Sequence, residues 1–249
     1  SVVETDIFNA ADPAVDFGWN IGVAAFDRGS AATATPGLHR DFHYLGVERT
    51  FSARLANGMY EVRLHKGDKG AARPALRVTA EVGTANQASQ VIAATAKNVF
   101  ANSTLLVTVS DGVLDLTINN DSGSGFWTVN GLEIERLGPL AATGTGTSGL
   151  SSAALTADTV NSLAAAAINR WAASGLTADQ VAILQNVEFV VRDLPGANLG
   201  LAAAQSGRVY LDDNGAGFGW FVDTTPNDDH EFYALSGSQE LLTAIDGPA

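Results

Sequence analysis

The densest group of residues able to do chemistry in this chain lies in its last quarter. The stretch GAGFGWFVDTTPNDDHEF, residues 215–232, follows two aspartates and opens with three glycines at alternate positions. Carboxylates in a glycine-rich loop are the hard oxygen ligands that Ca²⁺ prefers. The candidate calcium ligands are Asp212, Asp213, Asp223, Asp228 and Asp229. The regular spacing of an EF-hand is absent, so aspartates that cap turns of their own backbone are the alternative interpretation.

A second candidate is the pair His39 and His43, which have the four-residue spacing of a helical zinc pair. In the motif H-E-x-x-H the second position is the glutamate that acts as general base, and here it is Arg40. The chain has no cysteine, which excludes disulfides and cysteine-ligated zinc. We therefore expect histidines in solvent or on a sheet face, and we expect no zinc in this chain.

Acid–base pairs beside aromatic residues form the third candidate. Asp27-Arg28 and Arg40-Asp41 are adjacent acid–base dipeptides, and carboxylates, guanidinium groups and exposed ring faces are what a sugar-binding surface uses. Loop salt bridges, each of little value when exposed, are the alternative. The candidate ligand-binding residues are Trp19, Asp27, Arg28, Arg40, Asp41, Tyr44, Asp68 and Trp127. No G-x-S-x-G elbow is present, so the sequence indicates no catalytic residue.

Composition narrows the classes of partner. Hydrophobic residues make up 46% of the 249-residue chain and charged residues 16%, which indicates a globular protein. A net charge of −13 repels phosphate backbones, so nucleic acid is not expected as a partner and divalent cations are favoured. No apolar run reaches the roughly 18–20 residues of a membrane span. The chain starts at Ser1 without a signal peptide, so we expect a mature or excised bacterial protein that is secreted or at the cell surface.

The first half has only strand signals. The sequence TFSARLANGMYEVRLH alternates apolar residues on both sides of Asn57-Gly58, and TLLVTVSDGVLDLTI does so around Asp111-Gly112. Such pairs suit the type I′ turn of a two-residue hairpin, so two hairpins are predicted. Many short strands joined by turns indicate a mainly β protein with an antiparallel β-sandwich, a jelly roll, over residues 1–138.

In the second half, after a flexible linker expected at residues 139–154, the spacing of apolar residues changes from that of a strand to that of a helix. From Val160 to Trp171 apolar residues follow the spacing of one helix face, and Gly175 should end that helix. Thr177 and Gln180 form a capping box that opens a short helix. Strands are expected near 187–192 and 208–211. Residues 155–249 should therefore form a small α+β module built around Trp171, with the Trp-Phe pair at 220–221 packed on the first helix.

The β half resembles a galactose-binding-like, malectin-type jelly roll over residues 1–137. The residues that carry this resemblance are VDFGWN, FDRG, RDFHYLG, TFSARLANGMYEVRLHKGD, VTVSDGVLDLTI and VNGLEIERL, in that order. The resemblance implies a non-catalytic carbohydrate-binding or adhesive module, sometimes with a structural calcium. The basic segment LHKGDKGAARPALRV departs from it, so the glycan is left open.

The second half is similar to the N-terminal part of a matrixin-like zincin peptidase domain, on ALTADTVNSLAAAAINRWAASGL, VEFVVRDLPGANLGLA and GRVYLDDNGAGFGWFVDTTPNDDHEF. That resemblance implies a following H-E-x-x-H-x-x-G-x-x-H helix, but this chain reads YALSGSQELLTAIDGPA. His230 is the only histidine of this half. The zinc ligands and the glutamate base are therefore missing, and no metalloprotease mechanism is expected here.

Three functions remain open from the sequence. The first is a secreted, non-catalytic carbohydrate-binding or adhesive protein, or a segment of a larger surface protein, whose partner is a glycan or polysaccharide. The second is a structural subunit of an extracellular fibre or surface layer that associates with itself. The third is a processed fragment of a secreted metalloprotease, whose partner is the remainder of a larger polypeptide.

Overall fold

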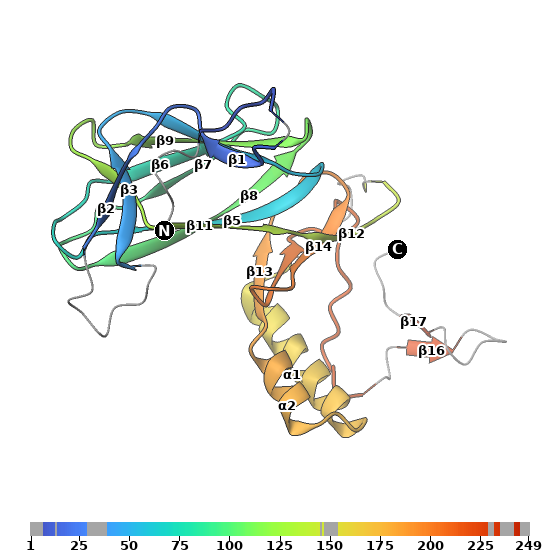
Figure 1. Cartoon of the computed structure of the whole chain (residues 1–249). Coiled ribbons are helices and arrows are strands. Elements are labelled where there is room, and N and C mark those ends of the chain that lie inside the picture. Colours follow the sequence, from blue (N-terminus) through green and yellow to red (C-terminus); the bar gives the residue numbers. More distant parts are fainter. Residues whose placement is uncertain are drawn as a thin grey trace. The chain divides into compact units, whose positions relative to one another are not determined.

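The structure is a computed structural model. It describes residues 7–12, 14–28, 39–144, 146 and 154–228, together with the backbone of 232–234 and 242–244. The chain divides into two compact units, Ser1–Arg136 and Leu137–Ala249 (Figure 1).

The first unit consists of strands only in its described part. Eleven strands follow one another: β1 Phe17–Trp19, β2 Ala24–Asp27, β3 Asp41–Leu45, β4 Arg49–Arg54, β5 Gly58–Gly67, β6 Leu76–Ala80, β7 Ala88–Ile92, β8 Phe100–Val109, β9 Val113–Asn120, β10 Trp127–Val129 and β11 Gly131–Arg136. One layer is a five-stranded sheet with the order β1-β4-β9-β6-β7. The other contains β11-β5-β8 and β10-β3-β2. Every pairing between these eleven described strands is antiparallel, which confirms the predicted antiparallel sandwich.

The two predicted hairpins are wrong, because both turns connect different layers. β4 pairs with β1 and β9, whereas β5, which follows the Asn-Gly pair at 57–58, pairs with β8 and β11. In the same way β8 and β9 flank residues 111–112 but lie in different sheets. The two turns lie beside each other, since Leu55 N–H donates to the carbonyl of Gly112 at 3.0 Å. Alternation located the strands correctly, but the turn residues did not identify their partners.

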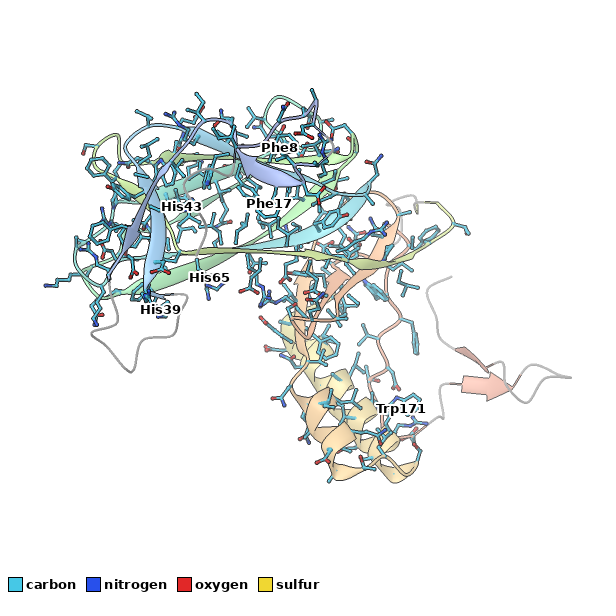
Figure 2. The ribbon with its side chains drawn as sticks, in the orientation of Figure 1. Phe8, Phe17, His39, His43, His65 and Trp171 are labelled. Atoms are coloured by element: carbon cyan, nitrogen blue, oxygen red, sulfur yellow. The ribbon has the colours of Figure 1, made fainter. Side chains whose placement is uncertain are left out.

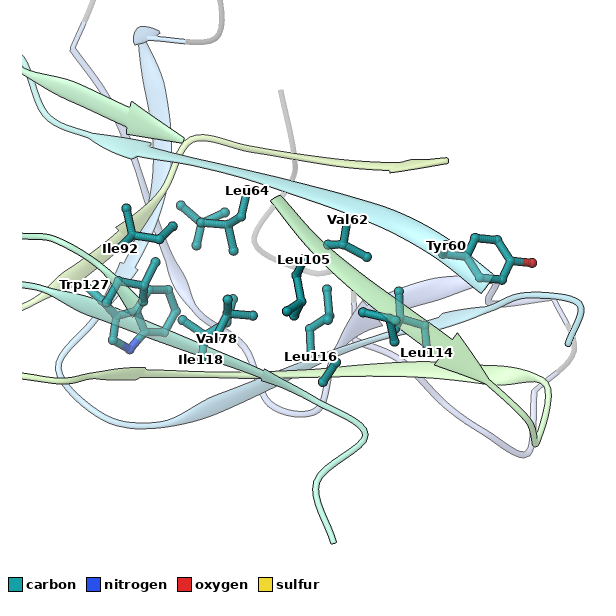
Figure 3. Close-up of a cluster of buried hydrophobic side chains, with 14 of the residues drawn as sticks. Tyr60, Val62, Leu64, Val78, Ile92, Leu105, Leu114, Leu116, Ile118 and Trp127 are labelled. Carbon is teal, nitrogen blue, oxygen red and sulfur yellow. The ribbon is translucent and has the colours of Figure 1, made fainter. Parts of the chain in front are cut away.

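The core lies between the two layers (Figure 3). Apolar side chains of β5 and β8 meet those of β6 and β9, and the alternate residues of β9 at positions 114, 116 and 118 are all buried. At one end Trp19 stacks on Trp127 with ring centroids 5.7 Å apart. This period-two pattern is the one expected where a sheet covers a core with one face.

The second unit contains two helices and a mixed sheet. Helix α1 spans Ala157–Ala173 and α2 spans Ala178–Gln185, and they are followed by β13 Glu188–Arg192, β14 Asn198–Ala203 and β15 Arg208–Asp212. The Thr177 capping box is present as predicted, with reciprocal bonds between Thr177 and Gln180. With β12, Gly138–Ala141, the sheet order is β12-β14-β15-β13, and β13 pairs with β15 in parallel. The expected small α+β module is therefore confirmed.

Two expectations for this unit are corrected. The first residues of the expected linker form strand β12, Gly138–Ala141, which pairs with β14. Trp171 is 61% exposed, so the module is not built around it; the buried side chains of α1 are Val160 and Ala166. A short pair, β16 Phe232–Ala234 and β17 Leu242–Ala244, follows. None of the described helices is long and apolar enough to cross a membrane.

Candidate functional site

Strand β3 sends its side chains alternately to the two faces of its sheet. His43, labelled in Figure 2, lies on the core side, where its Nδ1 atom accepts a 2.8 Å hydrogen bond from Trp19 Nε1. Its neighbours Phe42 and Tyr44 therefore lie on the opposite face. We call this face, formed by β2, β3 and β10, the outer face.

Four aromatic rings form a continuous row associated with the outer face. Phe26 on β2 stands opposite Phe42 on β3, and their rings stack with centroids 5.7 Å apart. Phe42 contacts Tyr44 edge-on at 6.0 Å, and Tyr44 contacts Phe126 edge-on at 5.7 Å. These separations are those that aromatic pairs prefer. Phe26 and Phe126, at the ends of the row, are 42% and 51% exposed, so ring surface is open to solvent at both ends.

A largely buried ion cluster covers Phe26 and Phe42 at one end of the row. The carboxylate of Asp68 accepts a bidentate pair of bonds from Arg28, at 2.7 and 2.6 Å, and a further bond of 3.0 Å from Arg73 Nε. The guanidinium carbon of Arg28 lies 4.4 Å from the Phe26 ring centroid, and that of Arg73 lies 5.2 Å from the Phe42 centroid. The two arginines therefore cover aromatic faces while Asp68 holds them in place.

Hydrogen-bond donors around Asp68 favour its ionised carboxylate. Burial alone would raise the pKa of Asp68, but hydrogen bonds from Arg28, from Gly70 N–H and from Arg73 outweigh burial and hold the pKa below its usual value. The hydrogen bond to Asp68 is also the main reason why the pKa of Arg28 is raised. Asp68 has no exposed surface on its side chain. The prediction that it offers an accessible oxygen to a ligand is therefore wrong.

The predicted acid–base residues at positions 27, 40 and 41 do come together. Asp27 and Asp41 face each other across β2 and β3, and Arg40 donates two bonds to the Asp27 carboxylate at 2.9 and 2.7 Å. Arg40 Nε also lies 3.4 Å from Asp41 Oδ1. The pKa of Arg40 is raised, first by the hydrogen bond to Asp27 and then by the charges of Asp27 and Asp41. The side chains of Arg40, Asp27 and Asp41 are 46%, 51% and 42% exposed, so their remaining polar surface faces solvent.

The predicted exposed tryptophans are corrected. Trp19 is 5% exposed and Trp127 is fully buried, so neither ring can stack on a ligand. Their polar atoms are satisfied internally, because Trp19 Nε1 donates to His43 and Trp127 Nε1 donates to the carbonyl of Val47 at 2.8 Å. A large ring whose N–H finds a partner inside is well suited to a core. Tyr44 is half-buried and keeps its place in the aromatic row.

The two histidines have different neighbours. His39 precedes β3 and stacks on Phe100 with ring centroids 3.9 Å apart. His43 lies within β3 and contacts the buried Trp19, with ring centroids 5.7 Å apart. His43 therefore occupies a sheet face, which is one of the two environments expected from the sequence.

The acidic residues of the second unit gather only in part. Asp193, Asp212 and Asp213 each place one carboxylate oxygen within 4.8 Å of the others. Asp193 was not predicted, yet its position follows from the fold. β13 and β15 are parallel, with Arg192 opposite Asp212, so both strands end at the same edge of the sheet.

The later aspartates of the loop have other contacts. Asp223 accepts a 2.7 Å bond from Thr225 N–H, which is the turn-capping role. Asp228 accepts a 3.5 Å bond from the Thr225 hydroxyl. Asp229 lies outside the described residues. The group at the strand ends is therefore the part of the predicted calcium set that the fold brings together.

Asp212 already has a structural role in this group. Its carboxylate accepts backbone bonds from Leu194 at 2.8 Å, Asn214 at 3.2 Å and Ala216 at 2.6 Å, and its side chain is buried. The loop that follows needs left-handed backbone at residues 215–217 and 219, where φ lies between +55° and +84°. Alternate glycines make this tight loop possible. Trp220 packs at its end and donates from Nε1 to the carbonyl of Asp212 at 2.7 Å.

The sequence interpretation missed Phe26, Phe42, Phe126 and Arg73. A signal was present for Phe42, because the alternation in RDFHYLG places Phe42 and Tyr44 on one face and the intervening histidine on the other. Phe126 and Arg73 lie in loops far along the chain, and only the fold brings them to this surface.

No family model and no curated protein matches this chain. Solved structures with some likeness include a Bacteroides uniformis β-glucuronidase 2 calcium-binding mutant, at 13% identity and TM-score 0.39, over 51% of this chain and 15% of that one. TmCBM61 in complex with β-1,4-galactotriose is 13% identical, with a TM-score of 0.30, over 47% of this chain and 88% of that one. The plant receptor-like kinase FER is 16% identical with TM-score 0.35, over 49% and 35%.

Proposed function

We propose that the first unit is a non-catalytic carbohydrate-binding module that holds a glycan against the outer face of β2, β3 and β10. The observation that carries this proposal is the aromatic row with exposed rings at Phe26 and Phe126. Ring faces stack on the C–H faces of sugars, and the half-buried Tyr44 between them adds a hydroxyl that donates and accepts.

Polar groups at the end of β2 and the start of β3, beside the outer face, complement the hydroxyl groups of a sugar. The exposed group Asp27–Arg40–Asp41 presents carboxylate acceptors beside a guanidinium donor. Phe26 is the residue next to Asp27 on the edge strand β2, so alternation turns the ring to the outer face and the carboxylate to the opposite face, and the polar group borders the aromatic row from that side. The Asp68 cluster has the different role of fixing Arg28 against Phe26. A surface held in this way binds with little loss of side-chain freedom.

Isothermal titration calorimetry on the full chain tests the proposal with a set of neutral and acidic oligosaccharides, among them β-1,4-galactotriose, the sugar in the TmCBM61 complex. We expect binding by at least one of them, and Phe126→Ala or Tyr44→Ala should weaken it about tenfold, as loss of one stacking ring predicts. Phe17→Ala is the matched control, because Phe17 is an equally exposed ring, at 53%, on β1 of the other layer.

Two outcomes contradict the proposal. One is no heat of binding with any glycan at millimolar concentration. The other is a loss of affinity in Phe17→Ala equal to that in Phe126→Ala, since a contact with both layers would not be a site on the outer face. The extracellular location and the zincin-like ancestry of the second unit stay predictions of the sequence.

A further inference from the structure

Strand β13 is an unprotected edge of the second unit's sheet within the described residues. The sheet order β12-β14-β15-β13 leaves one side of β13 without a strand partner there, and the other edge strand, β12, carries Pro139. Proteins protect edge strands with prolines, bulges, lysines or covering segments. The sequence of β13, Glu188-Phe-Val-Val-Arg192, has no proline or lysine, and its register with β15 runs without a bulge.

The backbone groups that β13 leaves free follow from its register. Glu188 N–H donates to the carbonyl of Gly207 at 2.9 Å, so residue 188 points its backbone groups toward β15. Alternate residues of a strand in a parallel pair do the same, so residues 190 and 192 also face β15. The N–H and C=O groups of Phe189 and Val191 therefore point away from the sheet, ready to pair with another strand.

The side chains at the two ends of β13 have opposite charges. Glu188 is 59% exposed and accepts two bonds from Arg208 on one oxygen, Oε2, which leaves Oε1 for a second donor. Arg192 is exposed, and in the part of the chain that the structure describes it forms no ion pair. Between them Phe189, Val190 and Val191 are only half-buried.

We propose that two copies of this chain associate through β13, paired antiparallel about a two-fold axis at Val190. In this register Glu188 stands opposite Arg192 of the second copy, and Arg192 stands opposite its Glu188. Phe189 stands opposite Val191 and Val190 opposite Val190. The free backbone groups of Phe189 then meet those of Val191, so the outward-facing donors and acceptors are paired. Opposite charges and aromatic–β-branched pairs are the cross-strand neighbours that stabilise antiparallel sheets.

The charges of Glu188 and Arg192 favour this antiparallel register over the other possible pairings of two β13 strands. Parallel pairing of two copies would place Glu188 against Glu188 and Arg192 against Arg192, which is destabilising. A shift by two residues would keep the backbone pairing but would place Glu188 opposite Val190 and lose both ion pairs. Only one antiparallel register uses every group of the strand, and it is self-complementary, as a two-fold interface requires.

Sedimentation velocity of the full chain from about 1 to about 200 µM, without any glycan, measures the association. We expect a monomer–dimer equilibrium, with the dimer dissociation constant raised at least tenfold by Arg192→Glu, which brings two carboxylate pairs into contact. Lys97→Glu makes the same change of charge at an exposed position in the first unit and should leave the constant within twofold of the wild type. Arg192→Glu removes no described ion pair, so circular dichroism should show an unchanged fold.

Mixing two variants provides the decisive measurement. Glu188→Arg and Arg192→Glu should each be monomeric alone, because like charges meet in both homodimers. The Glu188→Arg chain is basic at both ends of β13, and the Arg192→Glu chain is acidic at both ends. An equimolar mixture should therefore form a heterodimer within threefold of the wild-type constant, since every contact between the two chains then joins opposite charges.

Three results would each overturn the proposal. The first is a wild type that is monomeric at the highest concentration. The second is an Arg192→Glu chain that dimerises as the wild type does. The third is a mixture of the two folded variants that stays monomeric.

Discussion

Lys66 makes the stability of the first unit depend on pH in an unusual direction. Its side chain is fully buried at the end of β5, and its Nζ atom donates to the carbonyls of Pro74 and Ala93, the latter at 3.0 Å. Burial lowers the pKa of Lys66 from 10.5 to about 8, because the surroundings disfavour the charged form. A neutral amine still has two N–H groups, enough for both carbonyl acceptors.

The sign and size of the effect follow from the difference in proton binding. Below pH 8 the lysine is charged in both states, so the folded state carries the whole penalty of a buried charge. Between pH 8 and 10.5 the unfolded chain binds a proton that the folded chain does not, so the free energy of unfolding rises with pH. From pH 7 to pH 10 this contribution amounts to about 2.5 kcal/mol.

Urea denaturation at pH 7, 8, 9 and 10, followed by tryptophan fluorescence, measures this contribution when wild type is compared with Lys66→Met. Trp19 and Trp127 are buried in the same unit and report its unfolding. The stability of the wild type relative to the variant should increase steadily with pH. Lys97→Met, which removes an exposed lysine, should show a constant difference from wild type. If the free energy of unfolding of the wild type and that of Lys66→Met changed equally with pH across this range, a buried Lys66 that favours its neutral form would be refuted.

Two further predictions concern the other ionised clusters. Asp68→Asn leaves Arg28 and Arg73 without their buried carboxylate and should lower the free energy of unfolding by about 3 kcal/mol, whereas Asp27→Asn in the exposed pair should lower it far less. Equal losses in calorimetry would contradict this ranking. Calcium at millimolar concentration should raise the melting temperature of the second unit, and EDTA should reverse the rise. Asp213→Asn should abolish this rise, whereas Asp228→Asn should retain it. A rise that survives in Asp213→Asn would place the ion elsewhere.

The sequence predicted the elements well because their signals are local. The alternation of apolar residues from Phe51 to Leu64 and from Leu106 to Ile118 marks strands wherever they pair, since one face of each must reach the core. The capping box at Thr177 is likewise formed by residues three apart. Pairing is not local, and therefore the glycine turns at 58 and 112 were assigned to hairpins that do not exist.

The arrangement around those turns has a simple physical description. β4 and β5 behave as one long strand bent at residues 55–57, and β8 and β9 as another bent at 110–112. They pair with each other on both sides of the bend, from Arg49 opposite Ile118 to Gly67 opposite Phe100. A local hairpin would have placed β4 and β5 in one sheet, and likewise β8 and β9. The bend instead places β4 and β9 in one layer and β5 and β8 in the other, so that apolar side chains from both layers meet in one core.

The candidate site was misassigned for a related reason. Tryptophan is the larger stacking surface, so the sequence favoured Trp19 and Trp127, but these residues are far apart in the chain and only the fold shows that they stack on each other inside. Once Trp19 holds His43 on the core side of β3, alternation sends Phe42 and Tyr44 outward. The buried tryptophan contacts and the aromatic row of the outer face, which is buried at Phe42 and exposed at its ends, are thus two consequences of one register. A substitution that shifted β3 by a single residue would exchange the two faces of this strand, moving Phe42 and Tyr44 to the core side and His43 to the outer face.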